Sequence, residues 1–173
     1  MKILIISDIH GDYDSFNKAL ENEKYDKLIV LGDLFEYGSY YDEIDDSEII
    51  NKLIENKNKL LLIKGNCDYM IDYEKYGLYA HDIFSLTINN HVFTFTHGHL
   101  YNKINLPRFY GDVFVTGHTH IPKIEKEKNI IYLNPGSIGK PRGLSSKSYI
   151  LLDENKIQLK TIDRKIIKEM ILN

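Results

Sequence analysis

Two histidines stand two residues apart in the segment Gly117-His118-Thr119-His120, directly after the apolar run at residues 113–115. Packing gives no obvious reason for two imidazoles at this place. Gly117 lets the backbone bend at little steric cost, and the β-branched Thr119 keeps it locally extended. At the end of a strand, where the chain turns, the two rings can reach neighbouring points in one cleft. The pair therefore predicts a site, provided that other segments supply partner side chains.

Such partners follow apolar runs elsewhere in the chain. They are Asp8, His10, Asp33, Asn66 and His97. In an open parallel sheet, ligands bind beyond the carboxyl ends of the strands. We therefore expect all seven side chains to gather at one edge, where they offer two carboxylates, one carboxamide and four imidazoles.

This set of donors predicts a metal site. Oxygen and nitrogen donors without a thiolate favour Mn²⁺, Fe, Ni²⁺, Zn²⁺ or Mg²⁺ over Cu(I) or an iron–sulfur cluster. Seven ligands are too many for one ion and fit two ions that share a carboxylate. Two divalent ions bring four positive charges, and Asp8, Asp33 and a bridging hydroxide remove three of them, which leaves one to attract an anionic phosphoester. Two ions roughly 3.5–4 Å apart can activate the water between them and hold phosphoryl oxygens, so the set predicts phosphoester hydrolysis.

The elements that must position these residues alternate in the first half of the chain. Buried strands are predicted at residues 3–6, 28–31 and 60–63, because each is a continuous aliphatic run. Between them, residues 12–20 and 46–54 have helical spacing of apolar positions and candidate N-cap groups at their starts. The order is βαβαβ, which implies parallel strands with right-handed crossovers.

The second half is predicted to be rich in strands. Hairpins are expected at residues 83–95, around Asn89-Asn90, at residues 121–133, and at residues 147–162. A short helix is expected at residues 100–106, before Pro107, and the spacing of Ile162, Ile166, Ile167 and Met170 predicts a helical tail. With no linker or repeat, residues 1–173 are expected to form a single domain.

Composition restricts the class of protein. The chain has 173 residues and a net charge of −3, which argues against a large nucleic-acid-binding surface. Its one cysteine, Cys67, precludes an internal disulfide framework and fits a reducing compartment. The N-terminal apolar run is too short for a signal peptide or a membrane span. We expect a soluble, cytoplasmic protein.

The placed residues match a family pattern. The matching motifs are Asp8-x-His10, Gly32-Asp33, Gly65-Asn66-x-Asp68, His97-Gly98 and Gly117-His118-x-His120, with Asn134-Pro135-Gly136-Ser137 as a further echo. In this order they resemble the calcineurin-like metallophosphoesterase superfamily, and the small size and Cys67 are most similar to its YfcE-type phosphodiesterase branch. The resemblance implies a four-layer α/β/β/α sandwich with two mixed β-sheets and a metal-dependent phosphodiesterase, a phosphoric diester hydrolase.

The resemblance also implies roles for the residues. The first metal would take Asp8, His10 and His120; the second would take Asn66, His97 and His118; Asp33 would bridge them. The metal-bound hydroxide at this dinuclear centre would attack phosphorus. Asn66 would also steady the substrate phosphate, and Asp68 would orient its neighbours. Mn²⁺ is the first choice of metal, with Ni²⁺, Fe, Zn²⁺ and Mg²⁺ as alternatives.

The chain departs from many relatives at Cys67, where they carry a histidine that can protonate the leaving oxygen. A thiol is a poorer proton donor and carries no positive charge at neutral pH. We therefore expect esters with good leaving groups to react well and those with poor leaving groups to react slowly. Cys67 as a nucleophile is disfavoured, because no histidine is left to activate it.

Other side chains have weaker claims to a role. Tyr37, Tyr40 and Tyr41 could stack on a nucleobase, but an ordinary aromatic cluster in a loop explains them equally well. Arg142 is a weak candidate for a phosphate contact, alongside Arg108 and Arg164. His81, His91 and His99 are expected not to bind metal, and His91 is expected to be exposed in a turn.

Two other functions stay open at this stage. The first is a protein-interaction scaffold, because the retromer scaffold subunit has a similar fold with little or no catalytic role. The second is a phosphomonoesterase or nuclease of the same superfamily. The expected partner is a small phosphodiester, with no membrane partner, nucleic acid disfavoured by the charge, and a homo-oligomer allowed.

Overall fold

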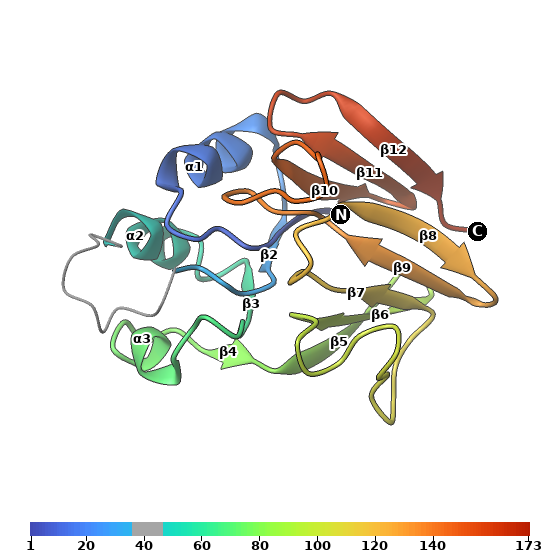
Figure 1. Cartoon of the computed structure of the whole chain (residues 1–173), viewed down its shortest axis with the longest axis horizontal. Helices are drawn as coiled ribbons and strands as arrows, with labels where there is room; N and C mark the ends of the chain where they lie inside the picture. The colour runs from blue at the N-terminus through green and yellow to red at the C-terminus, as the bar shows by residue number, and fades with distance from the viewer. Residues whose placement is uncertain (36–46) are drawn as a thin grey trace.

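The computed structural model describes residues 1–35 and 47–173 and contains two β-sheets with helices on one side (Figure 1). The seven-stranded sheet has the order β12-β11-β10-β1-β2-β3-β4, and the five-stranded sheet has the order β5-β6-β7-β9-β8. In the first sheet the strands are β1 (Lys2–Ile6), β2 (Lys27–Val30), β3 (Leu60–Ile63), β4 (Ala80–His81), β10 (Ser148–Asp153), β11 (Lys156–Thr161) and β12 (Ile166–Ile171). In the second they are β5 (Ile83–Ile88), β6 (His91–Thr96), β7 (Val113–Val115), β8 (Lys123–Glu127) and β9 (Ile130–Asn134).

The predicted βαβαβ unit is confirmed. Strands β1, β2 and β3 pair in parallel and are joined by α1 (Tyr13–Asn22) and α2 (Ser47–Glu55). Asp12 caps α1, since its carboxylate accepts a hydrogen bond from the backbone N–H of Ser15 at 3.0 Å. A third, unpredicted helix, α3 (Met70–Glu74), precedes β4. No described helix is both long and apolar enough to cross a membrane.

Two layers of apolar side chains hold this architecture together. One lies between the sheets and includes Ile5, Leu31 and Phe95. The other lies between the seven-stranded sheet and the helices and includes Ile6 and Phe16. Successive residues of β1 therefore alternate between two cores, which explains why this strand is apolar throughout. The two mixed sheets and the covering helices confirm the predicted α/β sandwich.

Residues 100–106 form an irregular segment, so the helix predicted there is wrong. Asn102 explains the difference. Its side-chain oxygen accepts hydrogen bonds from the backbone N–H groups of Ile104 and Asn105, at 2.9 and 3.1 Å, and its amide donates to Gly98 O at 3.3 Å. These local bonds satisfy backbone groups in a turn that competes with a helix.

The predicted helical tail is also wrong, because these residues form strand β12. Arg164, with a φ of 64°, turns the chain back, and Thr161 N donates to Lys165 O at 2.9 Å. The tail then pairs antiparallel with β11. A segment of about six residues is too short for a stable isolated helix, whereas the free edge of β11 offers it a full row of hydrogen bonds.

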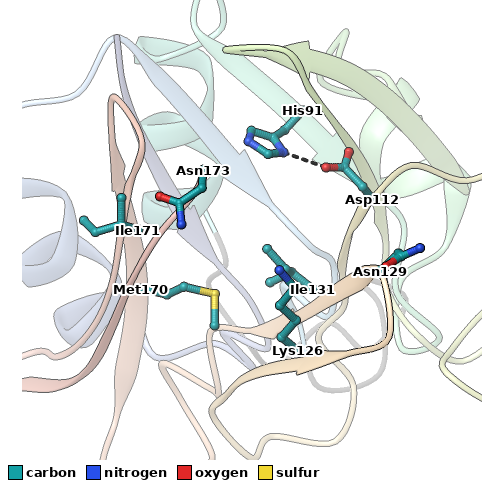
Figure 2. A pocket seen from close by; sticks show the side chains of 8 residues that line it. All are labelled: His91, Asp112, Lys126, Asn129, Ile131, Met170, Ile171 and Asn173. Carbon is teal, nitrogen blue, oxygen red and sulfur yellow. Dashed lines mark hydrogen bonds and ion pairs between the residues drawn. The ribbon is translucent and has the colours of Figure 1, made fainter.

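The hairpin predicted around Asn89-Asn90 is confirmed, but His91 is not the exposed turn residue that was expected. Asn89 and Asn90 have φ values of 49° and 68°, as a two-residue hairpin turn requires. Figure 2 shows the His91 ring facing Asp112, and its Nδ1 lies 2.6 Å from Asp112 Oδ2. This pair lines a pocket of about 340 Å³ at the amino-terminal end of β6.

Candidate metal centre

The candidate ligands lie where the carboxyl ends of strands from both sheets meet. Asp8, Asp33 and Asn66 follow β1, β2 and β3, while His97 follows β6 and His118 follows β7. The prediction of one common edge is correct, although that edge belongs to two sheets packed face to face. Backbone bonds join the loops, because Asp8 N donates to Gly32 O at 3.1 Å and Gly117 N donates to His97 O at 2.8 Å.

Five of the seven candidate ligands have left-handed backbone conformations. They are Asp8, His10, Asp33, His118 and His120, with φ between 47° and 62°. Positive φ is uncommon for residues other than glycine and is found mostly where the surroundings impose it, often at functional sites. The strained loops turn the side chains inward toward one another. No sequence pattern announced this conformation.

Two glycines permit the close approach of the loops. A Cβ on Gly65 would lie 2.1 Å from Asp33 Oδ1, and a Cβ on Gly117 would lie 1.9 Å from Ser7 Oγ and 2.8 Å from Asp8 Oδ2. Any larger residue would push the candidate ligand loops apart. The glycines in the predicted motifs are therefore required by the packing of the site itself.

Two clusters of donor atoms share Asp33. In the first, the donor atoms of Asp8, His10, Asp33 and His120 all lie within 4.8 Å of one another; in the second, those of Asp33, His97 and His118 do. Asn66 adjoins the second cluster, since its Oδ1 lies 3.1 Å from His97 Nε2. All seven predicted ligands are thus brought together, with Asp33 in the position expected of a bridging carboxylate.

One buried oxygen of the first cluster has no hydrogen bond. Asp8 Oδ1 is buried and accepts no hydrogen bond, although His120 Nε2 lies 3.2 Å away. His120 donates from Nδ1 to Lys140 O at 2.6 Å, which turns its Nε2 toward the carboxylate. An aromatic nitrogen with a lone pair and a carboxylate oxygen repel each other unless a proton or a cation lies between them. The unsatisfied Asp8 oxygen therefore fits a metal ligand.

The second cluster has the same arrangement. His97 is fully buried and donates from Nδ1 to Leu31 O at 2.6 Å. Its Nε2 faces Asp33 Oδ2 at 3.3 Å. A histidine held by one nitrogen and directed by the other toward an anionic oxygen is the arrangement in which imidazoles bind metal. The donor sets and their geometry fit divalent ions.

The surroundings keep Asp33 ionised. Burial alone would raise the pKa of this carboxyl, but its interactions with His97 and with the Cys67 backbone N–H outweigh burial and hold the pKa well below its ordinary value. The Cys67 N–H donates to Asp33 Oδ1 at 2.8 Å, which leaves Oδ2 facing the histidines. The shared carboxylate is thus available as an anion at neutral pH.

Asp68 lies behind the site and fixes its loops. Its two oxygens accept hydrogen bonds from the backbone N–H groups of Asp33, Leu34 and Gly65 at 2.8, 2.9 and 2.8 Å. Burial raises the pKa of Asp68. Its carboxylate therefore joins the loop after β2 to the loop after β3, as the predicted positioning role requires.

The Cys67 thiol is poorly suited to proton transfer. Burial, followed by the charge of Asp33, raises its pKa to about 12. At neutral pH the group is a neutral thiol that neither attacks as a thiolate nor gives up its proton readily. This agrees with the expectation that the residue contributes little as an acid.

The segment Asn134-Pro135-Gly136-Ser137 has a larger part in the site than the sequence indicated. Asn134 Nδ2 donates to Gly117 O at 2.7 Å, and Ser137 Oγ donates to Asp8 O at 2.7 Å. It thus braces two of the three loops that carry the first cluster, those after β1 and β7. Its sequence signals were a turn motif after an apolar run and its place as an echo of the family pattern. The carbonyl of Lys140, which orients His120, had no such signal.

Two of the remaining candidates lie beside the clusters. The His99 ring centroid is 5.3 Å from that of His97, outside both donor clusters. Arg142 is exposed and donates its backbone N–H to His120 O at 3.2 Å. Tyr37, Tyr40 and Tyr41 lie outside the described residues.

Comparisons with known proteins agree with this site. A family model described as the calcineurin-like phosphoesterase superfamily domain matches residues 1–156. Phosphodiesterase YfcE of Escherichia coli K12 is 30% identical over 188 aligned positions, which cover 100% of this chain and 99% of that protein. The solved structure of YfcE, a phosphoesterase from E. coli, has a TM-score of 0.90 at 29% identity and covers 100% of both chains.

A more distant neighbour shows how far the fold extends. Vps29 from Entamoeba histolytica, solved with Zn²⁺, has a TM-score of 0.64 at 20% identity and covers 100% of both chains. At this identity the similarity concerns the fold alone. The family match over most of the chain and the full-length similarity to YfcE decide the relationship: the chain belongs to the calcineurin-like phosphoesterase superfamily, in its YfcE-type phosphodiesterase branch, and is a phosphoesterase.

Proposed function

We propose that the chain is a metal-dependent phosphodiesterase with a dinuclear centre. The observation that carries this proposal is the pair of donor clusters that share Asp33, one of which contains a buried Asp8 oxygen without a hydrogen bond. A single ion held by either cluster would leave three of the seven donors unused. Two ions use all seven and leave a positive charge for an anionic ester.

The residues divide between the ions as the clusters divide. Asp8, His10 and His120 would hold one ion, Asn66, His97 and His118 the other, and Asp33 both. When bound, two divalent ions supply an activated water as the nucleophile and stabilise charge on the phosphoryl oxygens. Nitrogen and oxygen donors suit Mn²⁺, our first choice, and also Ni²⁺, Fe, Zn²⁺ and Mg²⁺.

The chain's own groups position the substrate. Asn66 is exposed at the edge of the second cluster, so its Nδ2 can donate to a phosphoryl oxygen while its Oδ1 faces the ion. Asp68 holds the loops of Asp33 and Asn66 in register through three backbone hydrogen bonds. Cys67 borders the site as a neutral thiol, so the leaving oxygen receives little help from it.

Hydrolysis of bis(p-nitrophenyl) phosphate tests the proposal. The purified chain is stripped with a chelator and assayed with and without added Mn²⁺. We expect turnover that needs Mn²⁺ and disappears again with excess chelator, and metal analysis should give two ions per chain. Absence of metal-dependent turnover with every one of the five metals would contradict the enzymatic proposal.

Substrate class is tested by the same assay. A phosphodiesterase should hydrolyse the diester faster than p-nitrophenyl phosphate and should leave plasmid DNA intact. Preference for the monoester, or cleavage of DNA, would favour the two related alternatives.

A protein-interaction scaffold is the second candidate function. The observation in its favour is the full-length similarity of fold to Vps29 chains. The two functions differ in what the donors do, since a scaffold needs no turnover. If the correctly folded chain binds metal but hydrolyses no phosphoester, the scaffold function is favoured.

A further inference from the structure

A second pocket adjoins the candidate metal centre on the outer face of the five-stranded sheet. It has a volume of about 450 Å³, within the range of small-molecule sites. Its lining includes His118 and Thr119 from the loop after β7 and Gly98 from the loop after β6. His118 belongs to both, so the pocket and the candidate metal centre share a wall residue.

The walls of this pocket are largely apolar. Phe114 and Tyr132, opposite each other on β7 and β9, line it with their rings 6.3 Å apart in an edge-on arrangement. Ile104 and Ile121 line it as well, and they are 98% and 45% exposed. An isoleucine that is almost fully exposed contributes nothing to the core, so burial by a bound group would stabilise the complex.

The two asparagines that line the pocket already make hydrogen bonds within the protein. Asn102 spends its side-chain bonds on Gly98 O and on the Ile104 and Asn105 N–H groups. Asn134 donates to Gly117 O and Thr119 Oγ1 and accepts from Gly136 N. Neither asparagine is well placed to recognise a polar group of a ligand, because most of its side-chain hydrogen-bonding capacity is used within the protein.

The two lysines at the pocket are also neutralised. Lys103 pairs with Glu125 at 3.3 Å and with Glu127, and Lys123 lies 3.5 Å from Glu125. Two positive and two negative charges cancel at this place. Within the described lining of the pocket, each lysine has an acidic partner, so a second phosphate or a carboxylate would gain little there. An uncharged ring would find Phe114, two isoleucines and the Tyr132 ring, whose centroid lies 5.2 Å from Lys103 Nζ.

We infer that this pocket receives an uncharged apolar or aromatic ester arm of the substrate, the arm that stays on phosphorus. The inference rests on the proposed function and narrows its substrate class to diesters with one such arm. Ile104 and Ile121 act as specificity residues, because they enclose the arm without contacting the reacting phosphorus.

The test compares two diesters with the same leaving group, methyl p-nitrophenyl phosphate and benzyl p-nitrophenyl phosphate. Both arms are alkoxy groups, so their intrinsic reactivities are similar. We expect kcat/KM to favour the benzyl ester by about tenfold or more in the wild-type chain. Ile104→Ser and Ile121→Ser should each lower the benzyl-to-methyl ratio by about 3- to 10-fold. The control Leu144→Ser removes an equally exposed aliphatic side chain outside the pocket and should leave the ratio unchanged.

Binding provides a readout that does not depend on turnover. Calorimetry with Mn²⁺ present should show benzylphosphonate binding about tenfold more tightly than methylphosphonate, with the difference reduced in Ile104→Ser. Equal binding and equal kcat/KM for both arms would overturn the pocket inference and leave the phosphodiesterase proposal standing. A benzyl preference in binding without hydrolysis of either ester would support the pocket and contradict the phosphodiesterase proposal.

Discussion

Strand β6 has a histidine facing an aspartate at its first residue and another just past its last residue, and the two pairs differ in almost every other respect. At its start, His91 Nδ1 lies 2.6 Å from Asp112 Oδ2, and Asp112 Oδ1 accepts from Val92 N at 2.7 Å (Figure 2). Just past its end, His97 Nε2 lies 3.3 Å from Asp33 Oδ2 in a buried environment. A six-residue strand separates the pairs by roughly 20 Å.

The difference shows what makes such a pair part of a site. The Asp112 carboxylate finds a partner for each oxygen and is 43% exposed, so it needs nothing more. The buried Asp33 shares its surroundings with Asp8 and four histidines, and one Asp8 oxygen has no hydrogen bond. Among residues 1–35 and 47–173, three or more such donors gather only at this end. Surplus donors in a buried place distinguish a candidate metal site from a satisfied ion pair.

Matched substitutions at the two pairs give the largest contrast. Asp33→Asn removes the charge shared by both clusters, and we expect metal-dependent hydrolysis of bis(p-nitrophenyl) phosphate to fall by more than about 100-fold. Asp112→Asn makes the same chemical change at the other end of β6 and should leave kcat/KM within about twofold. Steady-state kinetics at saturating Mn²⁺ measure both. Similar losses in the two variants would show that the comparison is wrong.

Much of the candidate metal centre was predictable from the sequence. Buried runs predicted β1, β2 and β3, and the polar residues after them had to arrive at the carboxyl edge. Asp8, Asp33 and Asn66 are therefore where the pattern placed them. This worked because a parallel sheet relates strand ends to one edge without any knowledge of side-chain packing.

The details of the loops were not predictable, for physical reasons. The left-handed conformations of His118 and His120 depend on contacts between the two sheets. Every residue has a backbone carbonyl, so the residue type of Lys140 gives no sign that its carbonyl accepts a hydrogen bond from His120. Strand β12 has apolar spacing that also fits a helix, and only the free edge of β11 decides between them. The partner of His91 is 21 residues away and belongs to no motif.

Asp68→Asn tests whether Asp33 needs its support as well as its charge. The replacement puts an NH₂ group where a carboxylate oxygen accepts backbone hydrogen bonds, so two donors would face each other. We expect Mn²⁺ affinity, measured by calorimetry, to fall by about 10- to 100-fold, and kcat/KM with it. Asp163→Asn, at an exposed residue that pairs with Lys18, is the control and should change neither. Unchanged Mn²⁺ affinity in Asp68→Asn would remove the positioning role.

Cys67→His tests whether one more imidazole beside the candidate metal centre speeds hydrolysis. The native thiol has a pKa of about 12 and is a poor acid at neutral pH, whereas an imidazolium can protonate a departing oxygen. With methanol or ethanol as the leaving group, we expect the rate of the variant to exceed that of the wild type by about tenfold. With p-nitrophenolate as the leaving group, we expect a rise of no more than about twofold. The measurement is the rate of the variant divided by the rate of the wild type, determined separately for each leaving group. An equal change for both leaving groups would contradict the role assigned to the thiol.

The smallest effect is expected at the His91–Asp112 pair, where it concerns the thermal stability of the fold. Burial alone would raise the pKa of Asp112, but the hydrogen bonds from His91 and Val92 N outweigh it and lower the pKa below the ordinary value of 3.8. A carboxyl with a lowered pKa in the folded state stabilises the fold above the unfolded pKa and loses that contribution as the pH falls through its folded pKa. Because the group is partly exposed, Asp112→Asn should lower Tm at pH 7 by only about 1–3 °C. Thermal unfolding followed by circular dichroism from pH 7 to pH 3 should show this difference shrinking below about pH 4. A difference that keeps its full size at pH 3 would mean that Asp112 contributes through packing and not through its charge, and the satisfied ion pair at this end would lose its electrostatic basis.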